Sequence, residues 1–190
     1  MIEMVAFLGN PGTQYAKTRH NLGWLCLENI PLLQNLQWKS KFKGEWASLQ
    51  TGSTKQIILK PDTYMNKSGE SIGAAATFFK IQPENVLIVH DDIEIPFGTW
   101  QVKKGGGLGG HNGLRSIYSA MGKKEFYRLR LGVGRPARGD VASHVLGRFN
   151  PQEEAELDLV YPGIEKILQA LTTTEPDKLR PNLQKGKIHN

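Results

Sequence analysis

Six polar side chains of this sequence are of the types that hydrolyse an activated ester when they meet in one site. They are one base, one carboxylate, a second imidazole and three amides: His20, Asp91, His111, Asn10, Asn66 and Asn112. A neutral imidazole, with an ordinary pKa of ~6.5, can take a proton from water, and a carboxylate on its other nitrogen selects the required tautomer. Amides can stabilise a developing oxyanion without adding charge. This chemistry needs no serine or cysteine nucleophile.

The surrounding sequence predicts that these groups lie at the carboxyl ends of β-strands. An apolar run over 4–8 predicts a buried first strand, and the NPG sequence at 10–12 turns the chain directly after it. The apolar run over 86–89 predicts a second buried strand, which ends in the HDD sequence at 90–92. Ligands of open α/β sheets bind at this edge. A hairpin is predicted over 46–60, so we expect an α/β fold with a mixed sheet.

Helical spacing of apolar residues places helices next to the same groups. One helix is expected to begin near Thr18 or Asn21, with His20 at its mouth, and another is expected to begin near Ser68. A final helix is predicted over 151–171, with an internal PG pair that should kink or divide it.

Length and composition indicate one globular domain over residues 1–190. A chain of 190 residues with 39% hydrophobic content can bury a core without disulfides, and Cys26 is its single cysteine. We see no apolar segment long enough to span a bilayer and no secretory leader pattern. These features favour a cytoplasmic protein with no membrane partner.

Positive charge is concentrated in one segment. Residues 101–150 contain ten Lys or Arg and two acidic residues, a net charge of +8, whereas the whole chain carries +6. This distribution favours binding to a polyanion such as RNA, since Lys and Arg contacts to phosphate dominate nucleic-acid affinity. The alternative is a basic surface that keeps the protein soluble and has no partner.

Three segments in and after this basic region are expected to be flexible or are rich in glycine. The sequence GGGLGGHNG over 105–113 brings backbone amides close to a ligand. Its glycine spacing formally fits a dinucleotide fingerprint, but the motif is not in the first βαβ unit. Residues 135–150 are rich in Gly, Pro and Arg, and we interpret them as a mobile flap. The tail over 172–190 is polar and basic, and we expect it to be loose.

Two other chemistries fit parts of the sequence less well. Asp91, Asp92 and Glu94 could hold a divalent cation, but no spaced ligand set recurs elsewhere, so we rank a metal below a hydrogen-bonding role. The GESIG sequence around Ser71 formally fits a nucleophile elbow. That elbow requires a hydrophobic strand leading into the serine, and TYMNKS precedes it here.

The sequence closely resembles bacterial-type peptidyl-tRNA hydrolases over about residues 1–171. The resemblance rests on several segments in one order: LGNPG (8–12), Tyr15, TRHNLGW (18–24), TYMNKSG (63–69), HDDIEIPFG (90–98), GGGLGGHNGL (105–114), RLRLGVGRP (128–136) and HVLGRF (144–149). It implies a monomeric three-layer α/β/α domain with a mixed, mostly parallel central sheet. It also implies hydrolysis of the ester that joins a peptide to the 3′ end of tRNA, without a metal or another cofactor.

The resemblance assigns a role to each candidate residue. It implies that His20 is the catalytic base, that Asp91 is its partner, and that Asn10, Asn66 and Asn112 bind substrate and stabilise the oxyanion. Other positions line the substrate site, with Tyr15 and Met65 in the peptide channel and His111 at its flank. Lys103 and Arg130 would bind phosphates of the tRNA acceptor arm.

A noncatalytic RNA-binding protein is the remaining alternative, because plant organellar intron-splicing proteins also resemble this family. Such a protein could keep the fold and the basic surface. The presence of His20, Asp91 and all three asparagines favours an enzyme.

Overall fold

Segments rich in apolar residues form the centre of the fold as four neighbouring parallel strands. In the computed structural model, which describes residues 1–187, these strands are β4 (Thr54–Pro61), β1 (Met4–Phe7), β5 (Val86–Asp92) and β7 (Tyr127–Gly132). Their side chains are largely buried on both faces, as expected for parallel strands between two helical layers.

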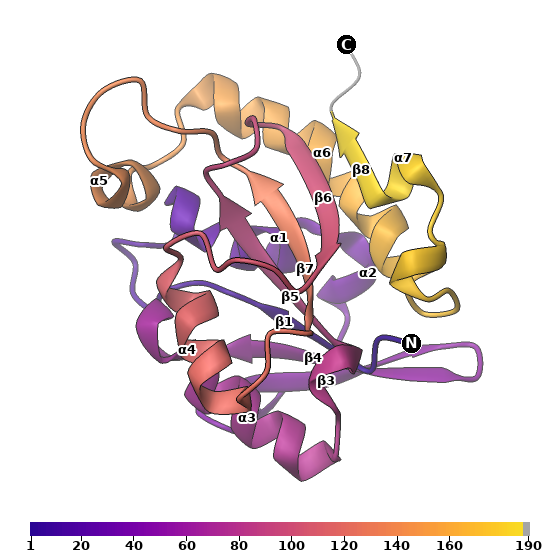
Figure 1. Ribbon diagram of the computed structural model, residues 1–190. Helices are drawn as coiled ribbons and strands as arrows, with labels where there is room; N and C mark the ends of the chain where they lie inside the picture. The colour runs from indigo at the N-terminus through magenta and orange to yellow at the C-terminus, as the bar shows by residue number, and fades with distance from the viewer. Residues whose placement is uncertain (188–190) are drawn as a thin grey trace.

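Antiparallel strands extend this centre on both sides into an eight-stranded mixed sheet, ordered β2-β3-β4-β1-β5-β7-β6-β8 (Figure 1). The additional strands are β2 (Lys39–Lys41), β3 (Gly44–Thr51), β6 (Thr99–Lys104) and β8 (Lys185–Lys187). The predicted hairpin is β3 and β4, which pair along their whole length. The predicted mixed sheet is therefore confirmed, and parallel pairing is confined to its four central strands.

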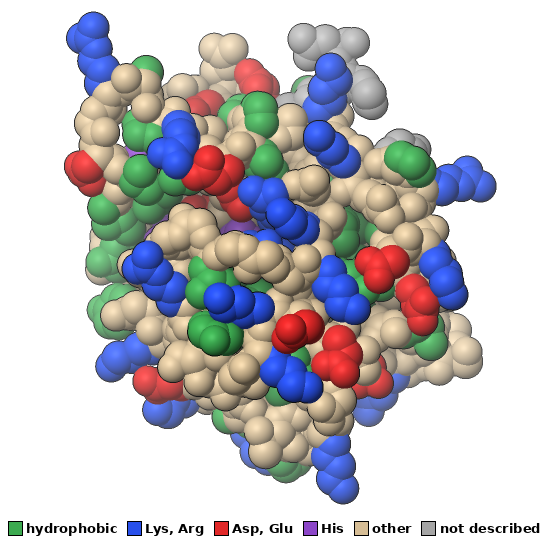
Figure 2. All heavy atoms as spheres, in the orientation of Figure 1, with side chains coloured by type: hydrophobic (Ala, Val, Ile, Leu, Met, Phe, Trp, Pro, Cys, Tyr) green, Lys and Arg blue, Asp and Glu red, His purple; other side chains and the backbone are tan. Residues whose placement is uncertain are grey.

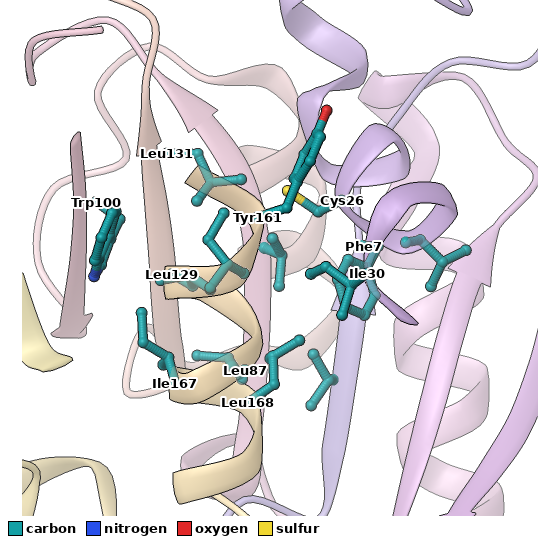
Figure 3. Close-up of a cluster of buried hydrophobic side chains, with 14 of the residues drawn as sticks. Phe7, Cys26, Ile30, Leu87, Trp100, Leu129, Leu131, Tyr161, Ile167 and Leu168 are labelled. Carbon is teal, nitrogen blue, oxygen red and sulfur yellow. The ribbon is translucent and has the colours of Figure 1, made fainter. Parts of the chain in front are cut away.

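Helices cover both faces of the sheet, which confirms the three-layer α/β/α class. Alternate residues of β1 divide between the two cores: Met4 and Ala6 pack with α3 (Ser68–Phe79) and α4 (Asn112–Met121). Val5 and Phe7 face α1 (Leu22–Asn29) and α6 (Pro151–Ala170). Figure 3 shows the second core, where side chains of α6 meet those of β5, β7 and α1.

Short elements complete the chain and carry several of the functional loops. They are α2 (Pro31–Gln34), α5 (Val141–Leu146), α7 (Pro181–Gln184) and the 3-10 turns η1 (Arg19–Asn21), η2 (Met65–Lys67), η3 (Pro83–Asn85) and η4 (Pro176–Lys178). Within residues 1–187, no helix combines the length and the apolar character needed to cross a bilayer.

Three segments differ from the sequence-based expectations. Pro162 does not divide α6, which is continuous over 20 residues and contains Pro162 in its interior. The supposed flap over 135–150 contains α5, whose N-terminus is capped by Asp140. The described part of the supposed loose tail forms η4, α7 and β8, and β8 pairs with β6. These short elements depend on tertiary contacts that local residue preferences do not encode. Residues 188–190 lie outside the described part.

The contact between α3 and α4 yields a test of the fold. A Cβ atom added at Gly69 would lie 2.1 Å from the carbonyl oxygen of Ser116. Gly69→Ala should therefore lower the free energy of unfolding by ~1–3 kcal/mol through overpacking, although alanine normally favours a helix. Urea unfolding measures this change. The control Gly107→Ala, where no atom lies within 4 Å, should have little effect; a stabilised Gly69→Ala protein would contradict the packing argument.

Candidate active site

A cleft of about 1100 Å³ opens at the carboxyl ends of the central strands and collects every candidate site residue. Its lining includes Asn10, Tyr15, His20, Met65, Asn66, Asp91, Lys103, His111, Asn112 and Arg130. In Figure 2, histidine side chains are visible between hydrophobic side chains near α5 and a group of Lys and Arg side chains. Residues from six distant parts of the sequence thus share one site.

The centre of this cleft is an imidazole–carboxylate pair. His20 lies in η1, and its Nδ1 is 2.9 Å and 3.1 Å from the two carboxylate oxygens of Asp91, near the end of β5. Asp91 is 2% exposed and His20 is 9% exposed, so little water competes for their hydrogen bond. The parallel pairing of β1 with β5 brings the two chain segments to the same edge.

A second imidazole binds the same carboxylate from α4. His111 is the N-cap of α4, where its Nδ1 accepts hydrogen bonds from the amides of Gly113 and Leu114 at 3.1 Å and 3.4 Å. Its Nε2 lies 3.1 Å from Asp91 Oδ1, and its ring centroid lies 4.9 Å from that of His20. Both ring nitrogens of His111 are thus engaged inside the protein, Nδ1 as the cap of α4 and Nε2 with Asp91.

The electrostatics of this trio determine where its protons lie. Burial alone would raise the pKa of Asp91, but His20 and His111 hold that pKa well below its usual range, so the carboxylate is ionised and only accepts hydrogen bonds. Accordingly, Nδ1 of His20 and Nε2 of His111 donate to it. For His20, burial acts to lower the pKa, but the adjacent Asp91 charge outweighs it and the pKa is raised above 6.5. When neutral, His20 keeps its lone pair on Nε2.

A third imidazole, His90, lies behind this trio and was not predicted as part of the site. It is fully buried, its Nδ1 donates to the carbonyl of Asp91 at 2.7 Å, and its ring meets that of His111 edge-on at 4.9 Å. Burial, together with His111, lowers the pKa of His90 to about 3. His90 is therefore a neutral packing partner of the trio.

Asn10 is fixed by backbone and side-chain contacts that leave one donor group available. Its Oδ1 accepts from the amide of Met65 at 2.7 Å. Its backbone amide and carbonyl both bind the side chain of Asn21 at 2.9 Å. Asn21 was expected as a helix cap, but its side chain makes no capping bond and instead clamps the strand end. The Nδ2 group of Asn10 has no partner among the described residues and can donate into the cleft.

Asn66 and Asn112 border the same space from the starts of two helices. Asn66 lies in η2, before α3, and Asn112 is the first residue of α4. Both are exposed, and within the described residues neither side chain makes a hydrogen bond to protein. Their amides can therefore bind a ligand, although their positions are also those of common turn formers.

One end of the cleft is apolar. Tyr15 meets Tyr64 edge-on, with ring centroids 6.4 Å apart, and Met65 lies beneath them. Across the cleft, α5 contributes side chains that the sequence analysis did not single out: Val141, Val145 and Leu146. We call these three residues the α5 wall. Val141 and Leu146 are 40% and 45% exposed, so α5 presents apolar surface at the cleft.

The other end of the cleft is basic. Lys103 is exposed and makes no ion pair in the part of the chain that the structure describes. Arg130 already donates to Asp92 at 2.7 Å and to Gln101 at 2.6 Å, which leaves it fewer free donors than the sequence suggested. The buried Arg128, absent from our prediction, binds the carbonyls of Gly105 and Gly107 and so holds the glycine-rich loop.

The alternative chemistries lose support in this geometry. Asp92 and Glu94 pair with Arg130 and Arg135, so they do not form the acidic metal site considered from the sequence. The described residues do include one group with metal-like spacing, His20, Asp91 and His111, but hydrogen bonds account for its geometry. Ser71 is fully buried inside α3 and does not line the cleft, so the nucleophile-elbow interpretation is wrong.

Comparisons with known proteins agree on one family. A sequence model described as Peptidyl-tRNA hydrolase matches residues 4–189. A peptidyl-tRNA hydrolase from Treponema pallidum is 43% identical over 179 residues, covering 92% of this chain and 89% of the relative. Another, from Trichlorobacter lovleyi, is 47% identical over 167 residues, covering 87% and 86%. The crystal structure of peptidyl-tRNA hydrolase from Acinetobacter baumannii matches with a TM-score of 0.90 and 33% identity, covering 99% of this chain and 97% of that one.

Proton positions in the His20–Asp91–His111 trio can be measured directly. We expect nitrogen NMR above the His20 pKa to find protons on Nδ1 of His20 and Nε2 of His111. Titration should give His20 a pKa above 6.5, since Asp91 stabilises the imidazolium. Asp91→Asn removes that charge, so the His20 pKa should fall, whereas Asp92→Asn should leave it unchanged. A wild-type His20 pKa at or below 6.5 would contradict the assignment.

Proposed function

Because the chain belongs to the peptidyl-tRNA hydrolase family and hydrolyses peptidyl-tRNA, we propose that His20 is the general base of this reaction and that Asp91 orients its ring. The observation that carries the proposal is the 2.9 Å contact between His20 Nδ1 and the ionised Asp91, which leaves the Nε2 lone pair for a water molecule in the cleft. Both residues lie where the substrate ester would enter.

In the proposed reaction, His20 Nε2 takes a proton from water as the water oxygen bonds to the ester carbonyl carbon. Negative charge develops on the carbonyl oxygen, and Nδ2 of Asn10 is the available donor that can stabilise it. The bond between the acyl carbon and the ribose oxygen then breaks, and the proton on His20 passes to that oxygen. The products are the peptide carboxylic acid, which then releases its proton to solvent to become the carboxylate, and a tRNA with a free terminal hydroxyl.

Two histidines donate hydrogen bonds to Asp91 in this proposal. It accepts one hydrogen bond from His20 and one from His111, and it stabilises the imidazolium form of His20 during the reaction. We therefore assign His111 a positioning role toward Asp91, because both of its ring nitrogens are already engaged. Asn66 and Asn112 border the cleft from η2 and α4, and their side-chain amides, which make no hydrogen bond to the described residues, would bind the polar groups of the substrate.

The two ends of the cleft suit the two halves of the substrate. The peptide would lie along Tyr15, Met65 and the α5 wall, which are mainly apolar. The acceptor arm of the tRNA would bind the basic end, where Lys103 forms no ion pair with the described residues and Arg130 is partly engaged by Asp92 and Gln101. We further propose that the protein acts as a cytoplasmic monomer of one domain, without a metal or other cofactor. The relatives' names favour this enzyme over a noncatalytic RNA-binding protein.

Replacement of the base gives the central test. His20→Ala should lower the turnover of an N-acetylated aminoacyl-tRNA by ~10²–10⁴-fold, the usual contribution of a general base. Release of free tRNA is measured on gels, and binding of deacylated tRNA should persist because the basic end is intact. A folded His20→Ala protein with wild-type turnover would refute the assignment.

The basic end can be tested through salt dependence. If Lys103 contacts a phosphate, Lys103→Ala should weaken tRNA binding and reduce the slope of log K against log salt by about one counterion. Lys55→Ala is the matched control, because Lys55 is an exposed lysine on β4 that does not line the cleft, and its slope should equal that of wild type. An unchanged slope for Lys103→Ala would remove this residue from the interface.

A further inference from the structure

The residues before His20 are paired with the segment that joins α5 to α6. The amide of Arg19 donates to the carbonyl of Gly147 at 3.0 Å, and Thr18 and Arg148 form an antiparallel bridge. Backbone pairing with residues 147–149 therefore fixes the position of the turn η1. The backbone that leads into His20 is thus hydrogen-bonded to the segment after α5.

The Arg19 side chain reinforces this connection with a network of charged hydrogen bonds. Its Nη2 donates to both carboxylate oxygens of Glu153 at 2.9 Å and 2.8 Å, and its Nη1 donates to the carbonyl of Arg148 at 2.9 Å. The guanidinium also lies 5.3 Å from the ring centroid of Phe149. One side chain thus binds three residues beyond α5: Arg148 and Phe149 on the segment that connects α5 to α6, and Glu153 in the first turn of α6.

Glu153 serves two partners at the same time. It is the third residue of α6, where its carboxylate accepts from the amide of Asn150 at 2.8 Å in a capping box. The same Oε2 atom accepts from Arg19. The start of α6, a long and well-packed helix, is therefore the fixed point to which Arg19 is attached.

The α5 wall lies between the contact of Arg19 with the start of α6 and a second contact made by His144. His144, in the middle of α5, contacts the carbonyls of Val133 and Gly134 at 3.2 Å and 3.0 Å, which joins α5 to the end of β7. At its other end, α5 leads directly into residues 147–149. The wall is consequently held against the sheet by His144 and against the His20 turn by Arg19.

The burial of the Arg19–Glu153 pair distinguishes it from a surface salt bridge. The two side chains are 13% and 21% exposed, so water screens their attraction only partly. Two residues before Arg19 and one residue after Glu153, Lys17 and Glu154 form a pair at 3.6 Å with side chains 64% and 45% exposed. Exposed pairs of that kind contribute little. The neighbouring pair therefore provides a matched control.

We infer that Arg19 and Glu153 are positioning residues for the hydrolysis, which hold the α5 wall in register with His20. The inference rests on the proposed function, because it takes His20 as the base and places the acyl group along α5. The base and the wall that holds the acyl group belong to different chain segments, and Arg19 is the side chain that joins them. Small displacements of a base from its reacting atom can lower turnover by up to ~10²-fold.

Charge-neutral variants test this inference. Arg19→Gln and Glu153→Gln should each lower kcat ~10-fold with little change in deacylated tRNA binding, since neither touches the basic end. Glutamine at 153 keeps an acceptor for the capping box. Arg19→Lys, which retains the charge, should recover part of the loss, and Glu154→Gln should behave as wild type. Circular dichroism and thermal unfolding establish that each protein is folded at the assay temperature.

The double variant shows whether Arg19 and Glu153 act on kcat through their mutual interaction or independently of each other. Arg19→Gln/Glu153→Gln should have a kcat close to that of the more impaired single variant, because the interaction is lost only once. Multiplied losses, or folded single variants with kcat within twofold of wild type, would overturn the inference. His20→Ala is assayed in parallel: if it keeps wild-type turnover, the proposed function fails, whereas an inactive His20→Ala beside unaffected Arg19 and Glu153 variants refutes only the positioning pair.

Discussion

The ionised carboxylate of Asp91, held in a place almost without water, is the interaction on which the site depends. Its burial alone would favour the protonated acid, and the carboxylate stays charged because two imidazoles donate to it. In return, the charge selects the tautomer of His20 and favours its imidazolium form. Neither histidine could be placed so firmly by solvent-exposed contacts, and no single element could supply all three groups.

The fold meets this requirement by bringing three chain segments to one edge of the sheet. Parallel pairing places the end of β5 beside the end of β1, so Asp91 comes next to the NPG turn and η1. The cap of α4 then adds His111 from the opposite helical layer. Asn21 locks the turn after β1 by binding both backbone groups of Asn10. The apolar layers supply rigidity, and the polar groups meet at the carboxyl ends of the central strands.

Sequence reasoning recovered the elements that have strong local signals. The buried runs of β1 and β5 and the hairpin of β3 and β4 follow from apolar patterning and turn chemistry. Residue types and motifs also identified ten of the residues that line the cleft. Tertiary contacts supplied what was missed: Asn21 looked like a helix cap, the α5 wall lay in a segment without apolar periodicity, and β8 has no strand signal of its own. The partial engagement of Arg130 by Asp92 depends on cross-strand register, which composition does not encode.

The two borders of the sheet are protected in different ways, and this has a consequence for synthesis of the chain. On one side β2 is short and bears exposed lysines, which discourage another strand from adding to it. On the other side β6 pairs with β8, which follows every other strand of the described residues in the sequence. While the ribosome is still making the segment after α6, the backbone of Thr99–Gln101 has no neighbour on that flank. Until residues 185–187 emerge, this stretch of β6 is an unpaired sheet edge to which another strand could add.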